Sequence, residues 1–180
     1  MKWLLKLFGW SIDITQIKSV KKSVIIEAPH TSNWDFIIGI LAAVSSEIKF
    51  HFIIKKEWDK PIIGSLLLGL GAIFINRSRA SGLTQQIIEQ FNKAKEGHII
   101  FTPEGTRSRV NKWKTGFYTV AHEAKIPISV GYIDYKEKKI GIAYTFYPTG
   151  NMKDDCLKLK SFYETIHPKN NQNFQPDWII

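Results

Sequence analysis

The sequence has little with which to build cross-links, a cysteine metal site or a membrane span. Its 180 residues include one cysteine, Cys156, so neither an internal disulfide nor a cysteine cluster for zinc is possible. This usage fits a reducing, cytoplasmic compartment best. The longest uncharged apolar stretch, residues 61–76, is interrupted by glycine and serine and falls short of the roughly 20 residues that span a bilayer. No small-residue cleavage site follows the apolar N-terminus, so we predict no signal peptide.

The sequence also lacks a long run of one charge, although its formal net charge is +9. The lysines are scattered, in pairs such as Lys21 and Lys22, and they form no basic arm of the kind that binds nucleic acid. Such a balance favours a polyanionic partner, either an anionic membrane surface or a phosphorylated substrate. We therefore predict no nucleic-acid partner, and we expect no metal site and no resident cofactor.

What the sequence does contain is an alternation of apolar strands with amphipathic helices. Hydrophobic residues make up 44% of the chain, which suffices for one packed domain. We expect strands at 24–26, 48–54, 72–75, 98–101, 127–135 and 140–147, and helices at 36–44, 61–71, 83–94, 116–125 and 154–166. This order predicts a single α/β domain, a central mixed sheet flanked by helices, with its site at the C-terminal ends of the strands.

Two terminal segments flank that domain, which we place at residues 21–166. Residues 1–20 contain an amphipathic helix, with Trp3, Leu4, Leu7 and Phe8 at helical spacing and lysines on another face. This composition suits insertion into a membrane interface or docking on the core of the domain, and the pattern does not decide between the two. Residues 167–180 form a mostly polar tail.

The first polar cluster lies on a strand-to-helix turn. A proline ends the strand at 24–26, and residues 31–33 are all good helix N-caps, so His30 sits on the turn and Asp35 in the first helical turn. At this spacing the carboxylate can hold one imidazole nitrogen, which leaves the other as a base. A capped turn with a locally hydrogen-bonded histidine would show the same spacing, so the pair needs support from elsewhere in the chain.

Two further polar clusters follow predicted strands. Arg77 comes just after the strand at 72–75, and residues 103–107, Pro-Glu-Gly-Thr-Arg, follow the strand at 98–101. Loops at the same edge of one sheet can converge on one site. Arginine binds phosphate in a bidentate manner, and Gly105 lets backbone N–H groups approach an anion closely.

In this order the clusters resemble the glycerolipid acyltransferases of the 1-acyl-sn-glycerol-3-phosphate acyltransferase (lysophosphatidic acid acyltransferase) type. The sequence matches their His-x-x-x-x-Asp block at 30–35, their Gly-x-apolar-aromatic-apolar-x-Arg block at 71–77 and their Phe-x-x-Glu-Gly-Thr-Arg-Ser block at 101–108. A fourth, proline-containing block is matched at 126–130, where Ser129-Val130-Gly131 stands in place of a second proline that is often found there. The resemblance covers about residues 20–150.

The resemblance implies that 21–166 is an acyltransferase domain. It implies transfer of a fatty acyl group from acyl-CoA or acyl carrier protein to the free hydroxyl of a lysophospholipid, with 1-acyl-sn-glycerol-3-phosphate as the expected acceptor and phosphatidic acid as the product. His30 would be the general base and Asp35 its orienter. The residues that it places around the phosphate and glycerol of the acceptor are Arg77, Glu104, Gly105, Thr106 and Arg107. Of these, Glu104 would orient an arginine or bond a hydroxyl.

Other functions fit part of the pattern. The acceptor can be a different lysolipid, a thioesterase or hydrolase can use the same His-Asp pair with water, and a non-catalytic lipid-binding or nucleic-acid-binding protein needs no such pair. No serine or cysteine occupies a nucleophile motif, which favours direct transfer without an acyl-enzyme. Residues 62–70 suit an acyl groove or the core. With a lipid substrate and no spanning helix, we expect a peripheral protein on the cytoplasmic face of a membrane.

Overall fold

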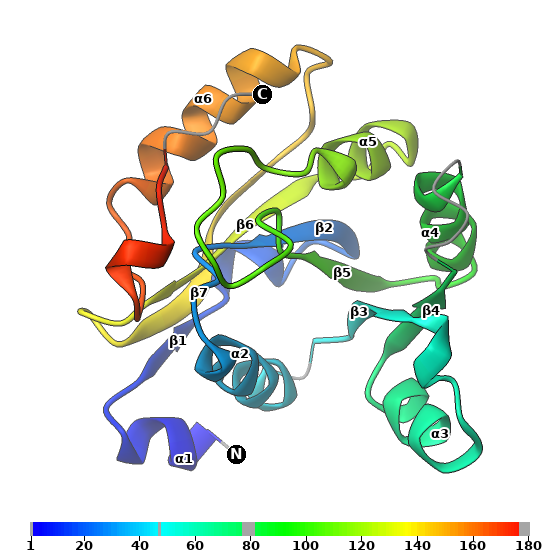
Figure 1. The fold of residues 1–180 in the computed structure, drawn as a ribbon, viewed down its shortest axis with the longest axis horizontal. Coiled ribbons are helices and arrows are strands. Elements are labelled where there is room, and N and C mark those ends of the chain that lie inside the picture. The colour runs from blue at the N-terminus through cyan, green and yellow to red at the C-terminus, as the bar shows by residue number, and fades with distance from the viewer. Residues whose placement is uncertain (1, 47, 77–81, 177–180) are drawn as a thin grey trace.

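The structure is a computed structural model, and it describes residues 2–46, 48–76 and 82–176. In this part of the chain, seven strands form one sheet in the order β1-β7-β6-β2-β5-β3-β4 (Figure 1). The strands are β1 (Ser11–Asp13), β2 (Lys22–Glu27), β3 (Phe50–Lys55), β4 (Ala72–Ile75), β5 (Gly97–Phe101), β6 (Ile128–Asp134) and β7 (Lys139–Phe146). Neighbouring strands are parallel except β6 and β7, which form an antiparallel hairpin. This confirms the predicted single α/β domain with a mixed sheet.

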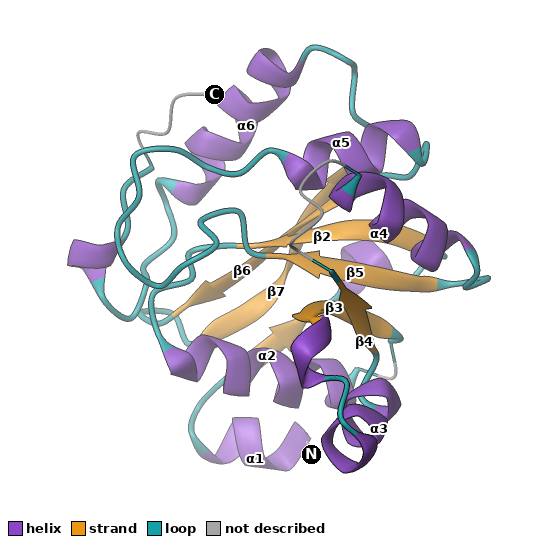
Figure 2. Ribbon diagram, turned by 45° about the vertical axis from the view of Figure 1, so that its right-hand side comes forward, coloured by secondary structure: helices purple, strands orange, loops and turns teal. Residues whose placement is uncertain are grey.

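Helices cover both faces of the sheet. Figures 1 and 2 show α1 (Lys2–Leu7), α2 (Asn33–Ser45) and α3 (Pro61–Gly69) on one side, and α4 (Leu83–Asn92), α5 (Gly116–Glu123) and α6 (Met152–Tyr163) on the other. Short 3₁₀ turns are η1 (Thr15–Ile17), η2 (Lys56–Trp58) and η3 (Asn171–Asn173). Every predicted helix and strand is present, with ends that differ from the expected ones by at most three residues. The sequence pattern does not predict β1, because three residues are too few for alternation to show.

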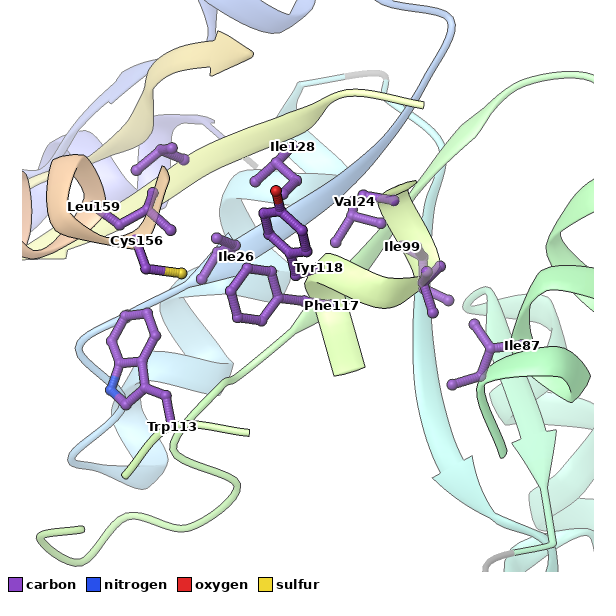
Figure 3. Close-up of a cluster of buried hydrophobic side chains, with 14 of the residues drawn as sticks. Val24, Ile26, Ile87, Ile99, Trp113, Phe117, Tyr118, Ile128, Cys156 and Leu159 are labelled. Atoms are coloured by element: carbon purple, nitrogen blue, oxygen red, sulfur yellow. The ribbon is translucent and has the colours of Figure 1, made fainter. Parts of the chain in front are cut away.

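The larger part of the core lies between the sheet and α4, α5 and α6 (Figure 3). Val24 and Ile26 of β2 pack there against Phe117 of α5 and Leu159 of α6. Cys156 also lies in this core and is 2% exposed, although the sequence around it is polar. Burial raises the pKa of its thiol to about 12, so it is no nucleophile at neutral pH.

A smaller cluster fills the other face. Leu5 of α1 packs there with Ile38 and Ala42 of α2 and with Ile133 of β6. Large apolar side chains that stay exposed are Trp3 and Leu7 of α1 and Phe8 just after it, while Leu4 is half-buried. One side of this helix therefore docks on the core of the domain, and another side remains apolar and exposed, as insertion into a membrane interface requires.

The apolar helix α3 is mostly exposed. Ile62 is 85% exposed and Leu66 is 66% exposed. The expectation that residues 62–70 belong to the core is therefore wrong for most of this stretch, in which Gly64 is the buried residue of α3. Only the C-terminal end of this stretch lines a groove, which is described below. Within the described ranges, no helix combines the length and the apolar composition that crossing a membrane requires.

Candidate active site

The polar loops follow strands that are neighbours in the sheet. Ile26 of β2 is in register with Phe101 of β5, so the loop that contains His30 begins beside the loop at 102–107. The backbone N–H of His30 donates to Glu104 Oε1 at 3.0 Å, which joins the two loops. The structure thus brings the first and third predicted clusters together. Arg77, from the second cluster, lies outside the described residues.

Local hydrogen bonds hold the turn that carries His30. Ser32 caps α2, and Asp35 Oδ2 accepts the N–H groups of Thr31 and Ser32 at 2.7 and 2.8 Å. Tyr135, the residue that follows β6, donates from its Oη to Asp35 Oδ1 at 2.5 Å. The Asp35 side chain is fully buried, and three donors satisfy its carboxylate. It is therefore held rigidly beside the histidine.

His30 lies close to Asp35 without a hydrogen bond between the side chains. Nδ1 of His30 is 3.5 Å from Asp35 Oδ2, and it has no hydrogen-bond partner in residues 2–46, 48–76 and 82–176. Burial lowers the pKa of His30 below its usual value, and the charge of Arg107 lowers it further, while Asp35 acts in the opposite direction. The imidazole is consequently neutral at neutral pH, the state in which it can accept a proton.

Glu104 contacts the backbone of the histidine turn. Its carboxyl is buried beneath the turn, with Oε1 bonded to the backbone of His30 and Oε2 without a partner in the described part of the chain. Among the described residues it forms no ion pair with an arginine. Burial raises the pKa of Glu104 to about 7, and the hydrogen bond from the His30 N–H opposes that rise. Glu104 therefore positions the histidine backbone, an interaction that the sequence does not reveal.

The glycine of the loop at 102–107 adopts a left-handed conformation. Gly105 has φ of +65°, and its N–H donates to the Thr102 carbonyl at 3.0 Å. The glycine also makes room for Lys114, because a Cβ there would lie 2.5 Å from Lys114 Nζ. Thr106 is exposed, and its hydroxyl accepts the Ser108 N–H at 3.3 Å. Sequence reasoning missed Lys114.

An apolar groove of about 810 Å³ runs from this cluster between α2 and the sheet. Such a volume is typical of sites for small organic ligands. Side chains of α2 and β3, including Ile40, Val44 and Phe52, form much of its wall, with Leu68 and Leu70 at the end of α3. The polar end of the groove is formed by Glu27, His30, Thr102, Gly105, Arg107 and Lys114. A groove with an apolar wall and a polar end suits ligands that combine a long apolar chain with a charged group.

Glu27, the last residue of β2, is a second residue that sequence reasoning missed. It lines the groove, and its Oε1 is buried with no hydrogen-bond partner among the described residues. Burial, together with the nearby carboxylates of Asp35 and Glu104, raises the pKa of Glu27 to about 8. The signal available in the sequence was a lone acid at the end of a strand that is otherwise apolar from residue 24.

The C-terminal segment is packed against the same turn. Asn170 donates through its N–H to Thr31 Oγ1 at 3.2 Å and through Nδ2 to the Thr31 carbonyl at 2.8 Å. Lys169 Nζ lies 4.9 Å from the ring centre of Trp34 on α2. This part of the predicted tail therefore supports the residue next to His30.

Within the described ranges, no group of three or more histidine, cysteine, aspartate and glutamate side chains could hold a metal ion. The chain was also compared with known proteins. The sequence model of the family described as Acyltransferase matches residues 11–132, which include both His30 and Arg107. Neither a curated protein nor a solved structure shows a significant match to the chain.

Proposed function

The chain belongs to the Acyltransferase family, and we propose that it transfers a fatty acyl group from a thioester donor to the free hydroxyl of a lysophospholipid. The donor is acyl-CoA or acyl carrier protein, and the acceptor is 1-acyl-sn-glycerol-3-phosphate, which becomes phosphatidic acid. The observation that carries this proposal is a neutral histidine at the point where an apolar groove meets cationic side chains. The groove suits an acyl chain, and the cations suit a phosphate.

The chemistry assigned to His30 is general acid–base catalysis. Nε2, the ring nitrogen that does not face Asp35, takes the proton of the acceptor hydroxyl while the hydroxyl oxygen bonds to the thioester carbonyl carbon. The carbonyl oxygen becomes an oxyanion, which collapses as the C–S bond breaks. The departing thiolate then takes the proton from the imidazolium. Asp35, 3.5 Å from the ring, stabilises the imidazolium between these two steps.

Recognition of the acceptor is assigned to the cations at the polar end of the groove. Arg107 and Lys114 line that end together with His30, and the resemblance adds Arg77. A guanidinium fits phosphate in a bidentate manner, and an ammonium adds a point charge. Thr106 and Gly105 form the loop that presents Arg107, while Glu104 acts on the histidine from below.

We assign the protein to the cytoplasmic face of a membrane, bound peripherally. Large apolar side chains are exposed on the three helical elements α1, η2 and α3, among them Trp3, Phe8, Trp58, Ile62 and Leu66. Figures 1 and 2 place α1 and α3 on the same side of the sheet. Exposed lysines at 55, 56 and 60 lie in or beside η2 and complement anionic head groups. Because Leu5 belongs to the core, α1 would bind the bilayer without leaving the domain.

The test is the substitution His30→Ala in the purified protein. With acyl-CoA or acyl carrier protein as donor and a panel of lysolipids as acceptors, turnover should fall about 10²- to 10⁴-fold, since that is the usual contribution of a general base. His122→Ala, at an exposed position on α5, is the matched control. Transfer by His30→Ala at the parental rate would refute the mechanism. Release of free fatty acid at the same rate with and without lysolipid would identify a hydrolase instead.

A further inference from the structure

Glu27 lies at the polar end of the groove. It is three residues before His30 and lines the same groove as the apolar side chains of α2 and β3. Its Oε1 is buried, and none of the described residues forms a hydrogen bond with it. Gly39 of α2 leaves the space that the carboxyl needs, because a Cβ there would lie 3.3 Å from Oε1. The site thus has room for a carboxyl group to which no described residue donates a hydrogen bond.

The three carboxyl groups near His30 differ in their hydrogen bonds. Counting donors in the part of the chain that the structure describes, Asp35 accepts from three and Glu104 from one, whereas Glu27 accepts from none. Donors stabilise a carboxylate, and burial next to other carboxylates destabilises it, so the shared environment leaves the proton on Glu27. The charged and titratable groups that line this end or act on it come from every neighbouring element: His30, Asp35, Glu104, Arg107, Lys114, Tyr135 and Tyr163.

A protonated carboxyl is a hydrogen-bond donor, and a fatty acyl thioester offers one strong acceptor. That acceptor is its carbonyl oxygen. With the acyl chain in the apolar part of the groove and the carbonyl carbon next to His30, this oxygen would lie near Glu27, because both residues line the same groove. Of the other carboxyl groups, Asp35 accepts from three donors and Glu104 holds the backbone of His30 from beneath the turn. The ammonium of Lys114 lies against Gly105, on the loop after β5.

We propose that Glu27 is a further catalytic residue, a neutral carboxylic acid whose O–H binds the thioester carbonyl oxygen of the donor and stabilises the oxyanion formed there. The inference rests on the proposed acyl transfer. During the step, the electron pair of the carbonyl bond moves onto this oxygen and returns when the C–S bond breaks. Glu27 keeps its proton throughout, while His30 carries the proton that moves.

Two substitutions test whether Glu27 acts as a hydrogen-bond donor, independently of its being a carboxyl group. Glu27→Gln retains a donor of the same shape, so its kcat should stay within about tenfold of the parental value. Glu27→Leu removes the donor, and its kcat should fall about 10²- to 10³-fold, with little change in KM for the acyl donor, as for the loss of one oxyanion-hole donor. Since burial places the pKa of Glu27 at about 8, parental activity should decline above that pH, and this decline should be absent from Glu27→Gln.

The proton on Glu27 can be observed without turnover. The infrared spectrum of the parental protein at neutral pH, minus that of Glu27→Gln, should show the C=O stretch of a protonated carboxyl. Absence of that band, or a folded Glu27→Leu with parental kcat, would overturn the inference. So would a folded Glu27→Gln that is as slow as Glu27→Leu. An inactive parental protein would instead refute the proposed acyl transfer itself, which keeps the two failures distinct.

Discussion

Replacing Glu27 by glutamine should stabilise the protein at neutral pH and leave its stability at acidic pH nearly unchanged. Burial raises the pKa of Glu27 from 4.5 to about 8. Between these values the folded state holds a proton that the unfolded state has released, so the stability of the parental protein falls as pH rises through this window. A glutamine does not titrate, so the variant does not lose this stability as pH rises.

The size of the effect follows from the width of the window. The interval from the unfolded pKa to pH 7 is about 2.5 pH units, and each unit is worth about 1.4 kcal/mol, which gives about 3.5 kcal/mol. Water in the groove screens the partly exposed side chain and lowers this to about 1–3 kcal/mol. The unbonded amide of the glutamine has its own cost. That cost is the same at every pH, so the difference between two pH values isolates the titration.

The assay is equilibrium urea unfolding followed by tryptophan fluorescence, from about pH 4.5 to pH 8.5, on the parental protein and Glu27→Gln. The free energy of unfolding of the variant, relative to the parental protein, should rise with pH and level off near pH 8. Glu57→Gln, at an exposed position on η2, is the control and should stay within about 0.5 kcal/mol of the parental value. A constant difference for Glu27→Gln across the range would show that Glu27 is ionised in the folded protein, and the reasoning would be wrong.

Two other predictions follow from contacts far apart in the sequence. Tyr135→Phe removes the third donor to Asp35, so kcat should fall roughly ten- to a hundredfold with unchanged KM, as for a hydrogen bond to a charged group; equal kcat for it and for the exposed control Tyr147→Phe would exclude a positioning role. Ile62→Asn with Leu66→Asn should weaken sedimentation with anionic vesicles at least tenfold, because each apolar side chain loses its insertion, and should preserve activity on a soluble short-chain lysolipid. A loss as large for Leu157→Asn, on the opposite side of the domain, would contradict this assignment of the membrane-facing surface.

The amino-acid sequence alone was enough to predict the order of the helices and strands and the turn that carries His30. Both depend on interactions within a few residues. Apolar alternation and helical periodicity define the elements, and a strand, a proline and an N-cap define the turn between residues 24 and 36. The meeting of that turn with the loop at 102–107 was also predictable, because parallel strands end at the same edge of a sheet.

Only the tertiary structure decided what each polar group touches. Tyr135 reaches Asp35 across 100 residues and Asn170 reaches Thr31 across 139, and no local pattern records either contact. The protonation of Glu27 likewise depends on burial and on the carboxylates of α2 and the loop after β5, which come near only because β2 lies between β5 and β6. Short-range rules specify which residues stand at the sheet edge, whereas burial and electrostatics, which depend on every neighbour in space, determine their charge and their partners.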